Sequence, residues 1–291
     1  MVPLIRTKGE FVFNYLNVFL LSLLSLSMVL PFIHIAAKSL SSEAHVLAKD
    51  IILWPKGFNT LSFEYVLTNR QFFYSFSNSV FITVVGTLVS MALTVLAAYA
   101  LSKKVLPYGR VLMLAFVITM FFSGGLIPTY LVVKEIGLMN TLWSLILPGA
   151  IAPFNLILIR NFFIGVPESL EESARIDGAS NWRILYSIYL PLSKPALATV
   201  AMFYAVGYWN SFFQAMMYIT ERRWIPLQMF LLQLVSDEKT ADTALNDVFR
   251  EITPETIRAA AILCVVIPIL LVYPFIQKYF VKGIMLGAVK G

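Results

Sequence analysis

Three carboxylates in one polar segment, residues 166–191, have the types and spacing best suited to chemistry. Glu168, Glu171 and Glu172 come directly after Pro167. Proline suits the first position of a helix, and acidic side chains near that end are stabilised by the helix dipole. The pattern predicts a short helix that starts here.

The rest of this segment predicts a turn and a second helix. Gly178 lies about three turns further on, where a residue in the left-handed conformation costs least for glycine. Ser180 can then cap a second helix, which we expect Pro191 to end. The segment is therefore predicted to form a helix-turn-helix.

The first of these two helices also offers a face to another protein. Leu170 and Ala174 lie one turn apart on it, and the small Ser173 lies beside them. A groove in a second protein can approach such a face closely. We therefore expect the helix-turn-helix to be a docking element.

No catalytic or metal-binding constellation is found in the sequence. Cys264 is the only cysteine and His34 and His45 are the only histidines, so no His/Cys cluster can form. The glycines and lysine of residues 283–291 lack the spacing of a nucleotide-binding loop, and no strand precedes them. We predict that this chain is not an enzyme and holds no metal or cofactor.

Uncharged polar and aromatic side chains occur inside long apolar stretches. Flat aromatic faces and amide groups bind sugars, so these residues are candidates for the wall of a substrate pathway: Asn78, Tyr204, Tyr208, Trp209, Asn210, Phe213 and Gln214. The alternative is an interfacial aromatic belt whose amides pair between helices. Because the apolar stretches contain almost no ionisable residue, a proton- or sodium-coupled carrier is disfavoured.

The composition is that of a protein embedded in a lipid bilayer. Hydrophobic residues make up 59% of the chain and charged residues 13%, with a mean hydropathy of +0.79. Six apolar segments are long enough to cross a hydrocarbon core of about 30 Å. They cover residues 11–37, 74–102, 111–133, 142–163, 196–219 and 257–281. The sequence predicts an all-α integral membrane protein with six transmembrane helices.

Residues that break helices stand in the third and fourth of these segments. They are Ser123, Gly124, Gly125, Pro128, Pro148 and Pro153. Such breaks are tolerated in membranes where neighbouring backbone or a cavity satisfies the freed polar groups. They predict hinges or sites of close packing.

The distribution of charge between the segments sets the orientation. With the N-terminus in the cytoplasm, 12 of the 22 basic residues lie inside with 5 of the 16 acidic ones, which leaves a net charge of −1 outside. Positive charge is expected on the cytoplasmic side. We therefore predict that both termini are cytoplasmic, with the first segment retained because its apolar run is too long for a signal peptide.

Two of the predicted outside loops are long. One covers residues 38–73 and carries Trp54 to Gly57, and the other, residues 220–256, is acidic and polar. Both suit a docking surface for a protein that delivers the solute, although a solvated cap without a partner remains the alternative.

The 166–191 segment resembles the coupling motif of ABC importer permeases. Glu172-Ser173-Ala174, three residues, Gly178, nine residues, and then Ile188, one residue, Leu190-Pro191 is similar to E-A-A, G and I-x-L-P, with Ser173 in place of the usual alanine. The resemblance implies that this coupling loop docks in a cleft of an ATPase subunit, where Glu172 pairs with a basic residue. The implied coupling residues are Glu171, Glu172, Ser173, Ala174, Asp177, Gly178, Leu190 and Pro191.

The resemblance extends over nearly the whole chain, residues 1–291, as a single type-1 transmembrane domain. Residues 121–128, 208–213 and 282–291 are similar to the carbohydrate branch, and most of all to permeases for complex oligosaccharides and polysaccharide fragments. The size resembles the smaller membrane subunit of the maltose importer. By that resemblance, the tail with Gly287 and Lys290 inserts between the ATPase subunits.

The resemblance also implies the partners and the place of work. These are a second permease, two ATPase subunits that bind ATP and Mg²⁺, an extracellular solute-binding protein, membrane lipid and an oligosaccharide, with no nucleic acid. The implied location is the bacterial cytoplasmic membrane. An ion-coupled transporter and a membrane-embedded enzyme are the competing classes, and the sequence leaves open whether the sugar is neutral or acidic.

Overall fold

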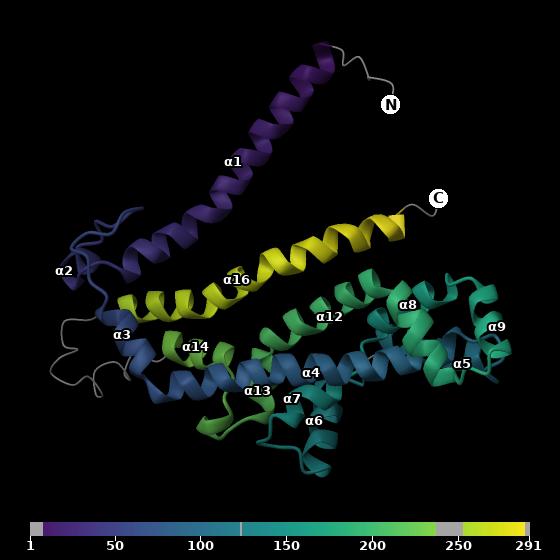
Figure 1. The fold of residues 1–291 in the computed structure, drawn as a ribbon. Coiled ribbons are helices and arrows are strands. Elements are labelled where there is room, and N and C mark those ends of the chain that lie inside the picture. Colours follow the sequence, from purple (N-terminus) through teal and green to yellow (C-terminus); the bar gives the residue numbers. More distant parts are fainter. Residues whose placement is uncertain (1–7, 123, 237–252, 289–291) are drawn as a thin grey trace. The chain divides into compact units, whose positions relative to one another are not determined.

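The computed structural model describes residues 8–122, 124–236 and 253–288, and every regular element in these ranges is a helix (Figure 1). Contacts divide the chain into two units. Unit 1 comprises Met1–Asn69 and Gln233–Ile267, and unit 2 comprises Arg70–Leu232 and Pro268–Gly291. The candidate site residues that the structure describes lie almost entirely in unit 2.

Unit 1 begins with the long helix α1 (Lys8–Ser39), followed by the short helices α2 (Glu43–Leu47) and α3 (Leu61–Thr68). None of the apolar window of α1 is buried by the rest of the chain. Lys38 at the end of α1 forms an ion pair with Glu255, near the start of α16 (Pro254–Ala288). The exposed apolar surface of α1 suits a helix whose neighbours are lipid or another subunit.

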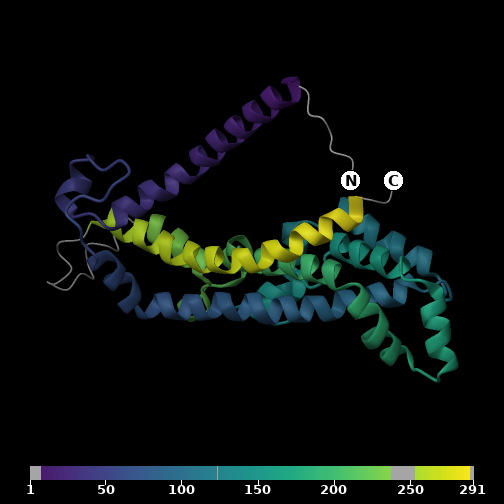
Figure 2. The ribbon, with the colours of Figure 1, turned by 45° about the horizontal axis from the view of Figure 1, so that its top comes forward.

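Unit 2 is built on three helices that pack against one another, α4 (Arg70–Ser102), α8 (Pro153–Ile164) and α12 (Lys194–Trp209), as Figures 1 and 2 show. The buried face of α4 carries small residues at helical spacing: Ser75, Ser79, Gly86, Ser90, Thr94 and Ala98. Small residues let helix backbones approach closely in a membrane, where no hydrophobic force drives helices together. The small residues of α4 therefore allow α12 to pack closely against it.

Among the described residues the structure has three to six candidate spans, so the six predicted spans are the upper limit. Three helices are long and apolar enough to cross a membrane, and the number rises to six if each bent helix pair forms one span. One pair is α5 (Gly109–Phe121) and α6 (Leu126–Glu135), on either side of the predicted break. A second is α7 (Trp143–Ile146) with η1 (Leu147–Gly149) and α8, bent by 54° at the predicted prolines Pro148 and Pro153. Pro128, by contrast, lies within the first turn of α6.

The fifth predicted helix, residues 196–219, is wrong as a continuous element. Helix α12 ends at Trp209, and α13 (Phe212–Tyr218) begins after a break. Asn210 Nδ2 donates to the Val206 carbonyl, which also accepts the helical N–H of Asn210 itself. The break comes at the next turn, where the Tyr208 carbonyl accepts from the N–H and the Oγ of Ser211, while the Phe212 N–H bonds to the Asn210 carbonyl. The Ser211 hydroxyl therefore helps to satisfy the Tyr208 carbonyl, which a continuing helix would have paired with the Phe212 N–H.

The long outside segments and the predicted tail contain more helix than the sequence indicated. Within residues 220–256 lie η3 (Arg222–Trp224) and α14 (Leu227–Ser236), while residues 237–252 are outside the described ranges. Helix α16 continues to Ala288 and so includes most of the predicted 282–291 tail. Lys290 lies outside the described residues.

Candidate functional site

The coupling loop, residues 166–191, folds as the predicted helix-turn-helix. Helix α9 (Glu168–Ile176) follows Pro167, and Gly178 adopts a positive φ of 76° at the turn. Ser180 then caps α10 (Asn181–Ile184) by accepting a hydrogen bond from the Arg183 N–H. The predicted helix start, turn and cap are therefore confirmed.

The predicted end at Pro191 is wrong. After α10 the chain continues through a π-helical turn, η2 (Leu185–Tyr189), into α11 (Leu190–Leu192), which contains Pro191. Proline removes a backbone donor and its ring crowds the preceding turn of an α-helix. The wider π turn directly before Pro191 gives the ring room, so the helical stretch ends only at Leu192.

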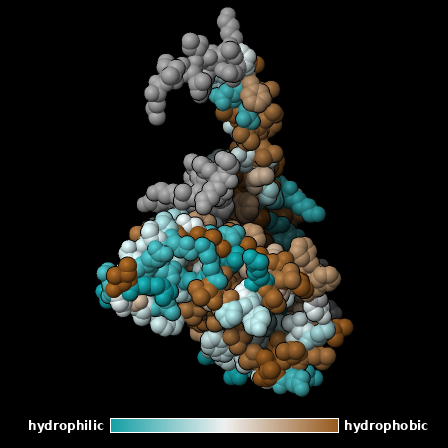
Figure 3. Space-filling view, turned by 90° about the vertical axis from the view of Figure 1, so that its right-hand side faces the viewer, coloured by the Kyte–Doolittle hydropathy of each residue, from teal (hydrophilic) through white to brown (hydrophobic). Residues whose placement is uncertain are grey.

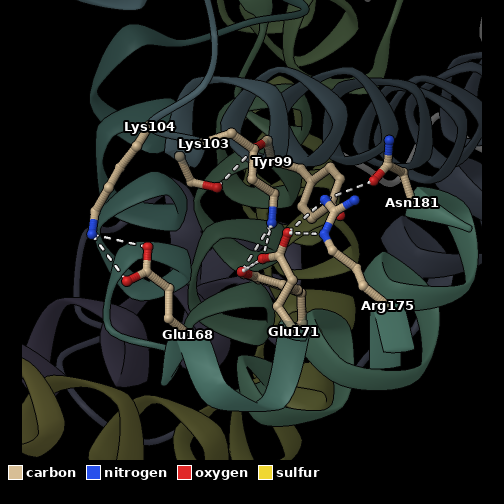
Figure 4. A network of polar contacts seen from close by, with 9 residues as sticks. Tyr99, Lys103, Lys104, Glu168, Glu171, Arg175 and Asn181 are labelled. Atoms are coloured by element: carbon tan, nitrogen blue, oxygen red, sulfur yellow. Dashed lines mark hydrogen bonds and ion pairs between the residues drawn. The ribbon is translucent and has the colours of Figure 1, made fainter. Parts of the chain in front are cut away.

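Glu171 lies at the centre of a polar network that joins three elements (Figure 4). Its carboxylate accepts hydrogen bonds from Lys103 Nζ at 2.5 Å, Tyr189 OH at 2.6 Å and Arg175 Nη2 at 2.8 Å. The Lys103 ammonium also lies over the rings of Tyr99 and Tyr189, 4.2 and 4.1 Å from their centroids. Because Lys103 directly follows α4 and Tyr189 lies in η2, one carboxylate ties α9 to both.

The protonation of this pair is set by burial and by hydrogen bonds acting in opposite directions. Burial raises the pKa of the Glu171 carboxyl, but the bonds from Lys103, Tyr189 and Arg175 outweigh it and lower the pKa from 4.5 to about 2. Burial lowers the pKa of the Lys103 ammonium, and pairing with Glu171 recovers only part of that shift. The charged form of Glu171, which accepts from three donors, is therefore stabilised more than the charged form of Lys103.

Glu172 is in a different position from Glu171, although the two are neighbours in the sequence. Its side chain is exposed and has no ion pair among the described residues, whereas the side chain of Glu171 is only 12% exposed. Of the other predicted coupling residues, Asp177, Gly178 and Pro191 are exposed and Ala174 and Leu190 are half-buried. Ser173 Oγ is used within α9, where it donates to the Ser169 carbonyl at 2.8 Å.

The coupling loop also exposes large apolar side chains, which the sequence reasoning did not single out. Ile176 is 87% exposed and Trp182 is 69% exposed, with Tyr186 also exposed on the following turn. Figure 3 shows hydrophilic surface gathered at this end of unit 2 next to hydrophobic surface. A polar element that exposes large apolar groups is typical of a surface that another protein covers.

A cavity of about 500 Å³ lies in unit 2 between α6, α7, η1, α8, α12 and α13. Four of the predicted pathway residues line it: Tyr204, Tyr208, Phe213 and Gln214. Ser144, Asn155, Phe203 and Tyr218 also contribute to the wall. None of its lining residues carries a charge.

The other three predicted pathway residues are not brought to the cavity. Asn78 Nδ2 donates to the carbonyls of Arg223 and Ile225. Trp209 packs edge-on against Phe76, and the Asn210 amide caps the end of α12 as described above. These three side chains stabilise the fold of unit 2 and do not line the cavity.

Two tyrosines join the cavity wall to the broken α7–α8 helix. Tyr204 OH bonds to Thr94 Oγ1 at 2.7 Å and accepts from the Ala152 N–H at 3.0 Å. Tyr208 OH bonds to Ser90 Oγ at 2.7 Å and donates to the Ile146 carbonyl at 3.2 Å. The hydroxyl groups therefore satisfy backbone groups that the helix break leaves free, as membrane burial requires.

Comparison with known proteins decides which kind of membrane protein contains these features. Residues 110–286 match the model of the family described as binding-protein-dependent transport system inner membrane component. This chain belongs to that family. The permease is thus a multi-pass subunit of the cytoplasmic membrane in a transporter of the ABC type, and not an enzyme.

Its relatives cover nearly its whole length. LplC of Bacillus subtilis (strain 168) is 46% identical over 98% of this permease and 97% of its own length. The polygalacturonan/rhamnogalacturonan transport system permease protein YtcP of the same organism is 46% identical over 93% of this permease and 96% of its own length.

A solved structure shares the fold. It is a bacterial ABC transporter involved in the import of the acidic polysaccharide alginate, and one of its chains is 34% identical to the permease with a TM-score of 0.88. The match covers 95% of the permease and 99% of that chain. The resemblance to permeases of the carbohydrate branch is confirmed.

Proposed function

We propose that this permease forms one half of a path for an oligosaccharide or polysaccharide fragment, and that ATP hydrolysis by a partner drives alternating access. The observation that carries the proposal is the uncharged, aromatic-lined cavity. Ring faces and amides suit a sugar, and the absence of charge favours release as well as entry. The names of YtcP and of the alginate importer support a saccharide, and oligogalacturonates are suitable test substrates.

The coupling loop is the proposed contact with the ATPase. Helix α9 offers the unpaired carboxylate of Glu172, and Ile176 and Trp182 supply exposed apolar surface beside it. Glu171 has the separate task of joining this surface to α4 through Lys103. Movement of α9 by the ATPase therefore reaches a membrane helix through a short, buried ion pair.

The remaining assignments follow from this arrangement. The coupling loop and both termini are cytoplasmic, as the positive-inside rule indicates. A second permease completes the pathway, two ATPase subunits bind ATP and Mg²⁺, and a solute-binding protein docks on residues 38–73 and 220–256. The end of α16, with Gly287, reaches the ATPase interface, and Lys290 beyond it completes that contact.

Charge reversal at Glu172 tests the proposal. Glu172→Lys places a cation against a basic groove, so saccharide-stimulated ATP hydrolysis and uptake by the purified complex should be lost while the helices still insert. Glu135→Lys, at the end of α6, is the control, because it reverses an exposed charge outside the coupling loop. Normal stimulated hydrolysis in Glu172→Lys would contradict the proposal.

A further inference from the structure

Residues 220–227, here termed the arginine segment, are fixed at both ends by side chains of other elements. Asn140 Oδ1 accepts hydrogen bonds from the Thr220 N–H at 2.7 Å, the Thr220 hydroxyl at 2.9 Å and the Glu221 N–H at 3.2 Å. Asn140 itself adopts a positive φ of 57°. Few non-glycine residues adopt this backbone conformation. Here the three hydrogen bonds to the Asn140 side-chain oxygen stabilise the turn.

Three polar residues of α4 hold the rest of the segment. Gln71 Nε2 donates to the Arg222 carbonyl at 2.6 Å, and Asn78 Nδ2 donates to the Arg223 carbonyl at 2.8 Å. Ser79 Oγ accepts from the Leu227 N–H at 2.7 Å. These bonds explain why the predicted pathway residue Asn78 does not line the cavity, and they hold the backbone of the segment where it carries its charges.

The fixed backbone presents two exposed guanidinium groups. Arg223 is oriented by an ion pair with Glu221 at 2.8 Å and by the ring of Trp224, which lies 4.9 Å from its guanidinium carbon. Arg222 is exposed and has no side-chain partner among the described residues. Each guanidinium group has a planar fork of N–H donors that matches the two oxygens of a carboxylate. Arg222 and Arg223 therefore offer two such groups side by side in the sequence.

The position of the segment relates these arginines to the cavity. Tyr218 lines the cavity, and the arginine segment begins two residues later. The Asn140 N–H donates to the carbonyl of the same Tyr218 at 3.0 Å. No residue lining the cavity is charged, whereas Arg222 and Arg223 are exposed cations only four and five residues after its lining residue Tyr218.

We propose that the arginine segment binds the carboxylate of an acidic saccharide, through Arg222 and Arg223, before the sugar enters the uncharged cavity. This inference rests on the proposed saccharide transport and assigns its substrate class as acidic. The guanidinium groups recognise the acid at a site open to water, where the carboxylate loses little of its hydration. The sugar then passes through the cavity lined by Tyr204, Tyr208 and Tyr218, where no charged side chain binds it.

The test compares a uronate with its uncharged ester. The complete transporter in nanodiscs, without binding protein, is titrated with tritiated trigalacturonate and with its fully methyl-esterified form. Arg222→Gln should weaken binding of the acid about tenfold and leave binding of the ester nearly unchanged, because only the acid forms the charge-assisted bond. Arg222→Lys keeps the charge but loses the fork, so it should give an intermediate affinity.

Lys134→Gln is the matched control, since it removes one exposed cation of α6 and should not change the preference for the acid. Equal weakening of acid and ester, no weakening in Arg222→Gln, or a wild type without preference for the acid would each overturn the inference. Equal weakening would show that Arg222 supports the shape of the site and does not contact the carboxylate. Uptake of trigalacturonate by the wild-type complex is measured separately, and its absence would overturn the saccharide assignment and the inference together.

Discussion

Charged side chains join the coupling loop to the rest of unit 2, whereas hydroxyl groups and aromatic rings join the cavity wall to its neighbours. At the loop, Glu171 and Arg175 of α9, Lys103 after α4 and Tyr189 of η2 form one polar network. At the cavity, Tyr204 and Tyr208 bond to hydroxyl and backbone groups, and their rings stack 6.4 Å apart.

Under the proposed function, the coupling loop transmits the movement of the ATPase and the cavity wall passes the solute. An ion pair with several donors is strong and directional, which suits a joint that transmits the movement of a docked ATPase. A wall without charges offers many weak contacts, which suits a polar solute that has to leave as easily as it enters. The predictions below test the two regions separately.

The largest effect is expected from removing the charge of Glu171. Glu171→Gln leaves the Lys103 ammonium, whose side chain is 18% exposed, without its carboxylate. Breaking a largely buried pair from one side costs about 3 kcal/mol. Thermal unfolding of the assembled complex should therefore shift clearly, and stimulated hydrolysis should fall.

Glu168→Gln is the matched control for this change. Glu168 lies on α9, as Glu171 does, and pairs with Lys104, which follows α4. Both side chains are largely exposed, so losing this pair should cost less than about 1 kcal/mol. Equal shifts in the two variants would show that the buried network is not the joint between α9 and α4.

The pH dependence sharpens the same comparison. The pKa of Glu171 is lowered from 4.5 to about 2 in the folded protein, so its contribution to stability is fully present above pH 4.5 and lost as the pH falls toward 2. The difference in Tm between the wild type and Glu171→Gln should stay constant from pH 8 to 5 and narrow below 4.5. Narrowing already between pH 8 and 6 would contradict the assignment.

A smaller effect is expected at the closest packing of the cavity wall. A Cβ at Gly86 would lie 2.9 Å from the ring of Tyr208, and Gly86→Val adds two further methyl groups. Overpacking of this kind typically costs about 2 kcal/mol, and here it displaces the ring that lines the cavity. Uptake should fall while basal ATP hydrolysis persists.

Leu88→Val is the control for that substitution, because Leu88 lies on the same helix α4, is 66% exposed and does not line the cavity. Full uptake by Gly86→Val would show that the position of Tyr208 does not matter for passage.

The smallest effect is expected from removing one hydroxyl group. Tyr208→Phe loses the bonds to Ser90 and to the Ile146 carbonyl but keeps the ring, so it should cost about 1 kcal/mol and leave uptake nearly intact. Tyr186→Phe, on an exposed ring, should have no measurable effect. A loss of uptake in Tyr208→Phe as large as in Gly86→Val would show that the hydroxyl binds the solute directly.

The sequence predicted the parts of the fold that depend on local pattern. The continuous helices α1 and α4, the turn at Gly178 and the cap at Ser180 follow from apolar run length and from residues with one strong conformational preference. The end at Pro191 and the continuous helix over 196–219 were wrong, because a π turn and side-chain caps at Asn210 and Ser211 depend on detailed geometry.

The candidate site was predictable in composition but not in the roles of its residues. Glu171 and Glu172 are neighbours of the same type, and only the approach of Lys103, 68 positions away, separates the internal ion pair from the exposed carboxylate. Likewise Asn78 and Tyr208 both are polar groups in apolar helices, yet tertiary packing turns one toward the arginine segment and the other toward the cavity.

Site-specific cross-linking at position 172 tests the central claim most directly. In a Cys264→Ser background, Glu172→Cys and Arg223→Cys each carry one thiol for a photoreactive maleimide in the assembled transporter. The account predicts that position 172 cross-links to the ATPase subunit and that position 223 does not. A product with the ATPase from position 223, or none from position 172 in either nucleotide state, would contradict the account.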